Sequence, residues 1–408
     1  MSRIALLLIA LARLNAADPE PRWLQANRAA REALLAKDWA KLRAAIAEFA
    51  PMVPGNPRVA YNLAVAEAKL GNRDAALKAL RDWAEMGLVA DVAGDDNLAT
   101  LRDAPEFAAV IARVAKSKEP VGRSTVAFPL PVRDMIPEDI AYDPATRRFF
   151  VSSVRKGIVI TAHGREFARS QWPILALRVD GAHKLLWAST GYVPQGESVK
   201  EADKDKTALL AFDLATGEQK RRIESPLPGL LGDMTIARSG DLYVSEGIHG
   251  AVLHLAPGAG KFERLDEPGE FPSPQTLALS ADEKILYVPD YIRGIAAMRL
   301  DTHKVEWLQP APGIALNGID GLYVHGKWFV AVQNGTTPER IVRFPLDLKS
   351  QEVLEANTPR LGEPTHGTFV GDDFYFLANS GWNEYDAKGK RKGEGAPVES
   401  EVRKVRVD

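Results

Sequence analysis

The sequence predicts a mostly β protein, a six-bladed β-propeller that follows an N-terminal helical domain, and two observations lead to this prediction. From residue 23 to about residue 116, apolar residues recur at spacings of three and four, as on one face of a helix. Beyond residue 124 the period changes to two, and six short β-rich phrases recur: FFVSS, LLWAS, LYVSE, LYVPD, WFVAV and FYFLA. Their central residues lie 36 to 57 residues apart. Six strand–turn–strand units near this period indicate six propeller blades.

The first 17 residues have the layout of a signal peptide. Arg3 is followed by the apolar run Ile4 to Ala12, and then by small residues at Ala16 and Ala17, where cleavage is expected. The run is too short to span a bilayer, and no later segment approaches the roughly 20 apolar residues of a membrane helix. We therefore expect a periplasmic or secreted protein with no membrane span in the mature chain. A frayed N-terminal helix is the alternative.

Composition excludes several classes of function. The 408 residues are enough for two domains, each with its own core. Basic and acidic residues nearly balance, 52 against 54, so no electrostatic footprint for nucleic acid is expected. The chain has no cysteine, which excludes disulfides, thiolate metal sites and cysteine nucleophiles. The nucleophile-elbow, zincin, P-loop and EF-hand patterns do not occur in it.

Residues 23–116 form the expected helical domain. The break VPGNP follows a first helical segment, and Gly71–Asn72 supplies a left-handed turn between two further helices. A third unit, DDNLATLRDAPEFAAVIARV, ends the run. Residues typical of one helical repeat occur at Tyr61, Ala64, Leu70–Gly71, Ala75–Ala76 and Leu80.

Those residues resemble the tetratricopeptide (TPR) family over about ninety positions. Each helix pair of such a repeat buries one face against the next pair and leaves a concave groove. The resemblance implies that the groove binds a protein or peptide partner. The alternative is that the helices act as a stabilising cap for the second half of the chain.

A linker at 117–124 precedes the propeller, which we expect over 125–408. A turn signal precedes each β-rich phrase: DPATR, DGAHK, RSGD, SADEK, HGK and GDD. The polar insertion at 192–207 is expected to be an exposed loop. The final VRKVRVD, or the early TVAFPL, could complete a blade and close the ring. Trp187, Trp328 and Trp382 are expected to pack between blades.

Polar residues occupy equivalent positions in several blades. The first strand of each blade lines the central channel, so positions five residues before each turn converge on the propeller axis. The residues at these positions are Glu138, Leu175, Gly232 or Asp233, Gln275, Asp320 and His366. In the third blade the turn could begin at either of two neighbouring residues, so the count gives Gly232 or Asp233.

Such a ring would be costly to bury without a cation or ordered water. Two carboxylates and an amide oxygen suit one divalent cation such as Ca²⁺ or Mg²⁺. The imidazole of His366 would also suit Zn²⁺ or Mn²⁺. A water-filled polar channel is the alternative. His366 could be a fourth ligand, a general acid or base, or a plain channel residue.

The segments PEDIAYDPATRRFFVSS, SPQTLALSADEKILYVPD and GIDGLYVHGKWFVAV resemble the SMP-30/gluconolactonase/LRE-like family of six-bladed propellers, over roughly residues 125–408. The resemblance implies one divalent cation held by Glu138, Gln275 and Asp320, with Asp320 also acting as general base. It implies hydrolysis of a lactone or related ester through polarisation of the substrate carbonyl. Gln275 departs from the asparagine that is usual in the family.

Asp233 and His366 are then expected to line the substrate pocket of a lactonase-type hydrolase. The rival hypothesis is a non-catalytic propeller and TPR interaction platform, because fold does not settle function. Asn334 and Arg340, in QNGTTPERIVRF, could contact substrate, but we expect a turn residue and a surface charge.

Overall fold

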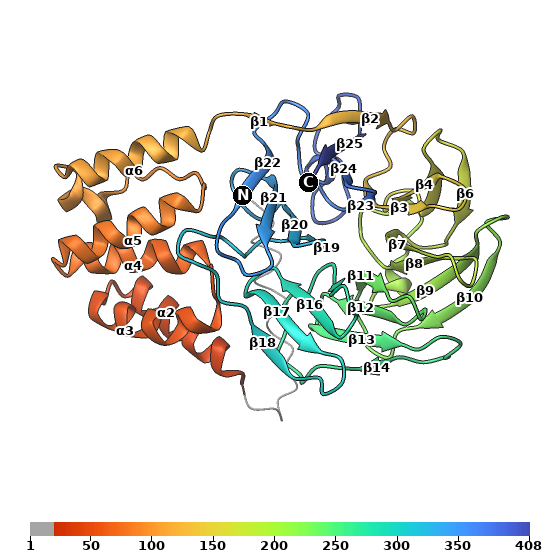
Figure 1. Ribbon diagram of the computed structural model, residues 1–408, viewed down its shortest axis with the longest axis horizontal. Helices are drawn as coiled ribbons and strands as arrows, with labels where there is room; N and C mark the ends of the chain where they lie inside the picture. Colours follow the sequence, from red (N-terminus) through yellow and green to blue (C-terminus); the bar gives the residue numbers. More distant parts are fainter. Residues whose placement is uncertain (1–19) are drawn as a thin grey trace.

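The protein is described by a computed structural model that covers residues 20–408. The expected signal peptide at 1–17 lies outside the described residues. Figure 1 shows a ring of β-sheets beside a stack of helices. The expected fold, a six-bladed β-propeller with a helical region before it, is confirmed by six separate antiparallel sheets. No helix within residues 20–408 is long and apolar enough to cross a membrane.

The blades follow one another along the chain, each with its inner strand first. Blade 1 comprises β3 (Pro137–Asp143), β4 (Arg148–Ser153), β5 (Ile158–Thr161) and β6 (Glu166–Arg169). Blade 2 comprises β7 (Ile174–Asp180), β8 (Leu185–Gly191), β9 (Thr207–Asp213) and β10 (Gln219–Glu224). Blade 3 comprises β11 (Leu231–Ile236), β12 (Leu242–Glu246), β13 (Ala251–Leu255) and β14 (Glu263–Arg264).

The remaining blades follow the same order. Blade 4 comprises β15 (Ala278–Leu279), β16 (Ile285–Asp290), β17 (Gly294–Arg299) and β18 (Val305–Trp307). Blade 5 comprises β19 (Gly321–His325), β20 (Trp328–Gln333), β21 (Arg340–Pro345) and β22 (Glu352–Ala356), and β1 (Val121–Gly122) pairs with β22 as a fifth strand. The expected linker therefore contributes its own short strand to the propeller.

Both ends of the propeller segment complete blade 6. Its strands are β23 (Gly367–Val370), β24 (Asp373–Leu377), β25 (Glu401–Arg406) and β2 (Thr125–Pro129), in that order from the axis outward. β2 pairs antiparallel with β25, with Thr125 opposite Lys404. VRKVRVD and TVAFPL, which were alternatives for closing the ring, therefore close it together.

One backbone feature recurs in the turn between the first two strands of every blade. Each turn contains a residue with positive φ, the conformation that glycine adopts most easily. Three are glycines, and the full set is Arg147, Lys184, Gly240, Glu283, Gly326 and Gly371. The turn signals in the sequence therefore mark the blades correctly. The polar insertion at 192–207 is a loop with one short 3-10 helix, Glu201–Asp203.

Apolar side chains fill the space between neighbouring blades. Between blades 1 and 2, Phe150, Leu186 and Phe212 are almost fully buried in one cluster. Burying a side chain of this size contributes about 1.5–3 kcal/mol. Trp187 packs between blades 2 and 3 as expected.

The helical module, residues 22–116, contains five α-helices within the described part of the chain. They are α2 (Arg22–Leu35), α3 (Trp39–Phe49), α4 (Pro57–Lys69), α5 (Arg73–Glu85) and α6 (Pro105–Lys116). Asp38 caps α3 by accepting from the amide of Lys41, and Asn56 caps α4 in the same way. Gly71 has φ +79° and makes the expected turn between α4 and α5.

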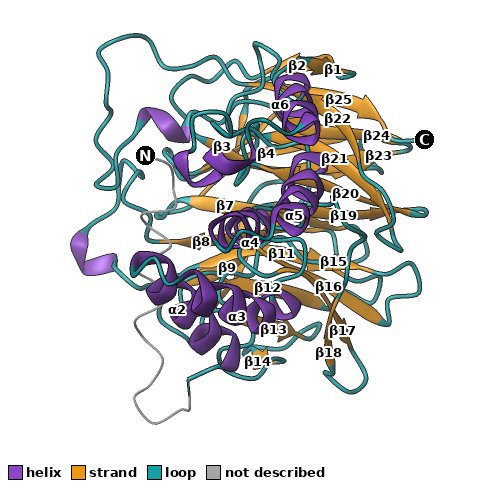
Figure 2. Cartoon of the chain, turned by 90° about the vertical axis from the view of Figure 1, so that its left-hand side faces the viewer, coloured by secondary structure: helices purple, strands orange, loops and turns teal. Residues whose placement is uncertain are grey.

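The loops of the helical module pack against blades 4 and 5. Figures 1 and 2 show the helices as a layer on one side of the propeller. The amide of Val89 donates to the carbonyl of Thr337 at 2.8 Å, and the side chain of Asn56 donates to the carbonyl of Ile292 at 3.0 Å. Ala315 of the propeller is buried within the apolar cluster of the module. The module and the propeller therefore share a packed interface.

Candidate metal and acid–base site in the propeller channel

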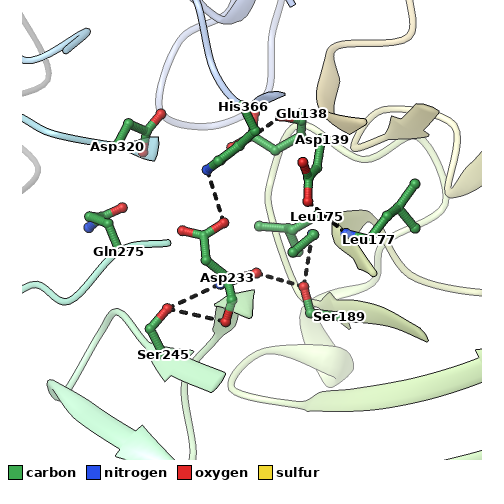
Figure 3. A network of polar contacts seen from close by, with 12 residues as sticks. Glu138, Asp139, Leu175, Leu177, Ser189, Asp233, Ser245, Gln275, Asp320 and His366 are labelled. Atoms are coloured by element: carbon green, nitrogen blue, oxygen red, sulfur yellow. Dashed lines mark hydrogen bonds and ion pairs between the residues drawn. The ribbon is translucent and has the colours of Figure 1, made fainter. Parts of the chain in front are cut away.

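The six channel positions lie at or just before the inner strands. Glu138 and Leu175 are the second residues of β3 and β7, and Asp233 is the third residue of β11. Asp320 and His366 stand one residue before β19 and β23. Gln275 lies three residues before β15. Its backbone amide still donates to the carbonyl of Pro289 on β16. Figure 3 shows these residues around one space at the axis.

Three of the predicted residues come together as a buried cluster, which we call the channel triad: Asp233, Asp320 and His366. One ligand atom from each lies within 4.8 Å of the other two. The triad is shielded from solvent, because exposed fractions are 6% for Asp233, 8% for Asp320 and 1% for His366. Two carboxylates and an imidazole are ligands that divalent cations such as Zn²⁺ and Mn²⁺ accept.

The orientation of His366 follows from the contacts of its two ring nitrogens. Its Nδ1 lies 2.7 Å from the carbonyl oxygen of Glu138. A carbonyl only accepts, so Nδ1 carries a proton and donates. Its Nε2 faces Asp233 Oδ1 at 3.0 Å, a contact that is an ion pair when Nε2 is protonated too. The backbone of blade 1 thus directs Nε2 toward the carboxylates.

The two carboxylates determine the protonation of His366. Burial acts to lower the pKa of this imidazole, but Asp233 and then Asp320 outweigh burial and raise the pKa well above its ordinary value. The two carboxylates thus favour the doubly protonated ring, and Asp233 lies in position to pair with it. A cation at the triad would compete with that second proton for Nε2.

Asp320 is oriented by a partner that the sequence did not indicate. The Asn334 side chain donates to Asp320 Oδ2 and, at 2.9 Å, to the carbonyl of Pro364. The Tyr291 hydroxyl in turn donates to Asn334 Oδ1 at 3.1 Å. Asn334 is 7% exposed, so it is a buried residue beside the triad in addition to lying in a turn.

Glu138 and Gln275 are held by other partners. The indole of Trp382 donates to Glu138 Oε2, and Glu138 is not a member of the triad. The Gln275 amide donates to the hydroxyl of Ser273 at 3.0 Å and to its carbonyl at 3.2 Å. The ligand set implied by the family resemblance, Glu138 with Gln275 and Asp320, therefore stays a prediction, and the triad is a second candidate set.

A β-bulge that recurs in blades 1 to 3 shows which residues of these blades are equivalent. In blades 1 to 3 the register between the first two strands shifts near the axis. A serine of the second strand accepts a hydrogen bond from the bulged amide in each blade, and the pairs are Ser152 with Asp139, Ser189 with Ala176, and Ser245 with Asp233. By this register Asp233 corresponds to Asp139, one position after Glu138.

Asp139 was missed by counting back from the turns for this reason. It is fully buried, and its Oδ2 accepts from Arg178 Nη1 at 2.7 Å and from the Leu177 amide at 2.8 Å. The negative charge of Asp233 also acts to raise the pKa of the Arg178 guanidinium, so this ion pair belongs to the channel. The FVSS, LWAS and YVSE phrases, each with a serine before the strand end, are the sequence signal that could have shown the bulge.

The donor set of the triad suits a divalent cation. Neutral His366 would offer Nε2 with Nδ1 already fixed by a backbone carbonyl, the arrangement that orients metal-binding histidines in general. The other cluster of three such groups within residues 20–408, His325 with Asp372 and Asp408, is more exposed. The residues present at the axis therefore fit a cation better than that cluster does.

Three solved structures show a distant likeness to this chain. No family model matches the chain, and no curated protein matches it significantly. A gluconolactonase structure from Xanthomonas campestris is 15% identical with a TM-score of 0.48, covering 71% of this chain and 98% of its own. The PQQ-bound aldose sugar dehydrogenase of Streptomyces coelicolor is 14% identical with a TM-score of 0.44, covering 70% and 99%. A chain of a nidogen/laminin complex is 10% identical, with a TM-score of 0.45 and coverage of 54% and 81%.

Proposed function

We propose that the channel is the active site of a divalent-metal-dependent hydrolase that acts on a lactone or related ester. One observation supports this most: His366 is fixed through Nδ1 so that Nε2 points at two buried carboxylates, Asp233 and Asp320. The resemblance of residues 125–408 to SMP-30/gluconolactonase-like propellers favours the same class of reaction. A periplasmic or secreted location belongs to the same proposal.

The channel triad would hold the cation, with Glu138 and Gln275 as further candidate ligands. When bound, a divalent cation would supply Lewis-acid polarisation of the ester carbonyl. Asp320 is the candidate general base, because the Asn334 amide fixes its orientation. Asp233 and the Glu138 carbonyl hold the ring of His366 in place. Low exposure of all three triad residues keeps bulk water from the reacting groups.

The first test is the metal content of the purified protein, measured by elemental mass spectrometry. We expect about one equivalent of a divalent cation in the wild type and none in the Asp233→Ala/Asp320→Ala variant. The matched control is Asp372→Ala/Asp408→Ala, which removes two carboxylates from the more exposed cluster and should keep the metal. No bound metal in the wild type, after dialysis against Ca²⁺, Mg²⁺, Mn²⁺ and Zn²⁺, would overturn the proposal.

The two candidate ligand sets give different results in the same assay. If the triad alone holds the cation, Glu138→Ala and Gln275→Ala keep it while His366→Ala loses it. If Glu138, Gln275 and Asp320 hold the cation, as the family resemblance implies, Glu138→Ala and Gln275→Ala lose the cation. A screen of lactones and esters in a pH-stat then tests the reaction, and Asp320→Asn should abolish any activity found.

The burial of the triad favours one second candidate, a non-catalytic interaction platform. Groups exposed by 8% or less can stabilise the channel without meeting a substrate. In that case the triad variants change stability while no lactone or ester is hydrolysed by the wild type.

A further inference from the structure

A second group of metal-ligating side chains lies where blades 5 and 6 meet: His325, Asp372 and Asp408, which we call the turn cluster. His325 is the last residue of β19, Asp372 lies in the turn between β23 and β24, and Asp408 follows β25 by two residues. One ligand atom from each lies within 4.8 Å of the other two. Blade 5 therefore supplies an imidazole, and blade 6 supplies two carboxylates.

The turn cluster is separate from the channel triad. Asp320 precedes β19 and His366 precedes β23, whereas His325 and Asp372 lie at the opposite ends of the same two strands. At about 3.3 Å per residue, the length of β19 places the two sites roughly 15 Å apart. An inference about the turn cluster therefore does not depend on the function proposed for the channel.

The side chains of the turn cluster are open to solvent and face one another. Their exposed fractions are 22% for His325, 43% for Asp372 and 47% for Asp408. His325 Nε2 lies 3.3 Å from Asp372 Oδ1 and 3.7 Å from Asp408 Oδ2. One nitrogen and two oxygens thus converge at a place that a cation can reach from water.

Both carboxylates are oriented by a partner on their other oxygen. The Arg406 guanidinium donates to Asp372 Oδ2 at 2.8 Å, which leaves Oδ1 toward His325. The Trp328 indole donates to Asp408 Oδ1 at 2.9 Å, which leaves Oδ2 toward His325. Outer partners of this kind orient the ligands of metal sites.

Two further contacts hold the blades together around the turn cluster. The His325 ring stacks on Phe369 of blade 6, with ring centres 4.3 Å apart and ring planes 7° apart. The amide of Val407 donates to the carbonyl of Asp372 at 3.0 Å, which keeps Asp408 beside that turn. The three ligand groups are therefore positioned before any cation binds.

The donor set selects the class of cation. Ca²⁺ takes about 6–8 oxygen ligands, whereas the turn cluster presents two carboxylate oxygens and an imidazole nitrogen. Zn²⁺ accepts this set in a tetrahedral site whose fourth position is left to water. Two carboxylates against the one guanidinium of Arg406 leave an excess of one negative charge when His325 is neutral, which favours a cation.

We propose that the turn cluster is an exchangeable zinc site that clamps blade 5 to blade 6. His325 Nε2, Asp372 Oδ1 and Asp408 Oδ2 are the ligands, and water completes the coordination. Because three partly exposed ligands hold the cation more loosely than a buried site does, we expect dialysis to empty the turn cluster. The one equivalent expected at the channel in the purified protein then stays the same.

The test is calorimetric titration of the full chain with Zn²⁺ and with Ca²⁺. The Asp233→Ala/Asp320→Ala variant removes the channel carboxylates, so the turn cluster is measured alone. We expect about one equivalent of Zn²⁺ to bind with a dissociation constant of about 100 µM or lower. Absence of Zn²⁺ binding at about 1 mM, or equal affinity for Ca²⁺, would overturn the proposal and leave His325 as an ion-pair partner of the two aspartates.

Three further substitutions in that background assign the roles. Trp328→Phe keeps an aromatic ring and removes the donor to Asp408, so it should weaken Zn²⁺ about tenfold. Loss of the ligand itself in His325→Ala should weaken Zn²⁺ at least as much. His303→Ala, an exposed histidine in a turn of blade 4, should change nothing. Unchanged Zn²⁺ affinity in His325→Ala would overturn the proposal.

If the channel variant does not fold, the wild type carries the test. His325→Ala should remove about one equivalent of the Zn²⁺ bound at saturation, whether or not the channel holds another. Saturating Zn²⁺ should raise the Tm of the wild type more than that of His325→Ala, because a ligand of the native state stabilises it.

Anomalous diffraction at the zinc edge locates the ion directly. We expect a peak about 2.0–2.1 Å from His325 Nε2. A peak at the channel triad alone would overturn this inference and support the channel proposal. A peak at the turn cluster alone would support this inference and count against a zinc ion in the channel.

Discussion

At the scale of single residues, the Asp139–Arg178 ion pair joins the inner strands of blades 1 and 2. Asp139 is fully buried, and Arg178 Nη1 lies 2.7 Å from its Oδ2. The amide of Leu177 donates to the same oxygen at 2.8 Å and links blade 1 to blade 2. Removing one member of a buried pair leaves the other charge unpaired, which is more costly than replacing both.

We therefore expect Asp139→Ala to lower the free energy of unfolding by about 3–5 kcal/mol. Asp301→Ala removes a carboxylate that pairs with Arg299 at the same 2.7 Å separation, but at an exposed site, and should have no measurable effect. Guanidinium denaturation followed by tryptophan fluorescence compares the two variants. Similar losses in both would show that burial does not decide the strength of these pairs.

A second prediction concerns Asn334, the donor to Asp320. Asn334→Leu keeps the size of the side chain and removes its hydrogen bonds to Asp320 and Pro364. Loss of such an outer partner typically weakens metal binding about 10- to 100-fold. Titration calorimetry with the resident cation measures this loss. Asn357→Leu is the control, since its side chain reaches only the carbonyls of Ser117 and Glu119, and it should keep the affinity.

Some residues of the site could be predicted from the sequence and others could not. Asp320 and His366 were found because each immediately precedes an inner strand, at a fixed distance from its turn. Asp139 was missed because a bulge shifts the register by one residue, which counting cannot detect. Arg340 is fully buried, and it was expected at the surface because local pattern does not show that a distant helix covers it.

At the scale of the strand, the bulge in blade 3 sets the direction of Asp233. Ser245 accepts from the Asp233 amide at 3.1 Å, and its own hydroxyl reaches the Asp233 carbonyl at 3.3 Å. Bulges commonly redirect a side chain beside a functional site. The two contacts from one serine therefore hold both backbone groups of a triad residue.

Ser245→Ala should then release the amide of Asp233. We expect a loss of about 1–2 kcal/mol in stability, because a buried donor loses its acceptor. Faster hydrogen exchange at the Asp233 amide, read by NMR, is the specific signature. Ser239→Ala, in an exposed turn of the same blade, should leave that rate unchanged. An unchanged Asp233 rate in Ser245→Ala would show that the bulge persists without the serine.

The second strand of each blade could be predicted from the sequence. The six β-rich phrases are the second strands of the six blades, because alternating apolar residues and turn signals are local properties. The inner strand of blade 4 is only Ala278–Leu279. Pro274 and Thr276 make isolated bridges instead, Thr276 to Gly321 of blade 5. Such pairing between blades depends on tertiary packing.

At the scale of the whole molecule, two loops serve both the site and the helical module. Tyr291 contacts Asn334, while the next two residues, Ile292 and Arg293, bond to the module. The second loop places Asn334 against Asp320 and the Thr337 carbonyl against the amide of Val89. The module therefore supports the loops that orient Asp320.

Arg293→Ala tests this support. The Arg293 guanidinium donates to the Met52 carbonyl at 3.1 Å and stacks 3.9 Å from the ring centre of Trp307. We expect a loss of about 1.5–3 kcal/mol and faster hydrogen exchange in α2 and in residues 52–56, measured by mass spectrometry. Arg299→Ala, on the same blade with an exposed pair, should change neither region. Unaltered exchange in residues 52–56 of Arg293→Ala would contradict a supporting role.

Blade 6 pairs two strands that are synthesised at very different times. β2 leaves the ribosome early, and its partner β25 follows about 270 residues later. At about 5–20 residues per second, β2 waits roughly 15–50 s before its partner exists. During that interval an unpaired strand edge is open to wrong partners. The nascent chain must therefore keep β2 from other partners until β25 has been made, and the ring cannot close before then.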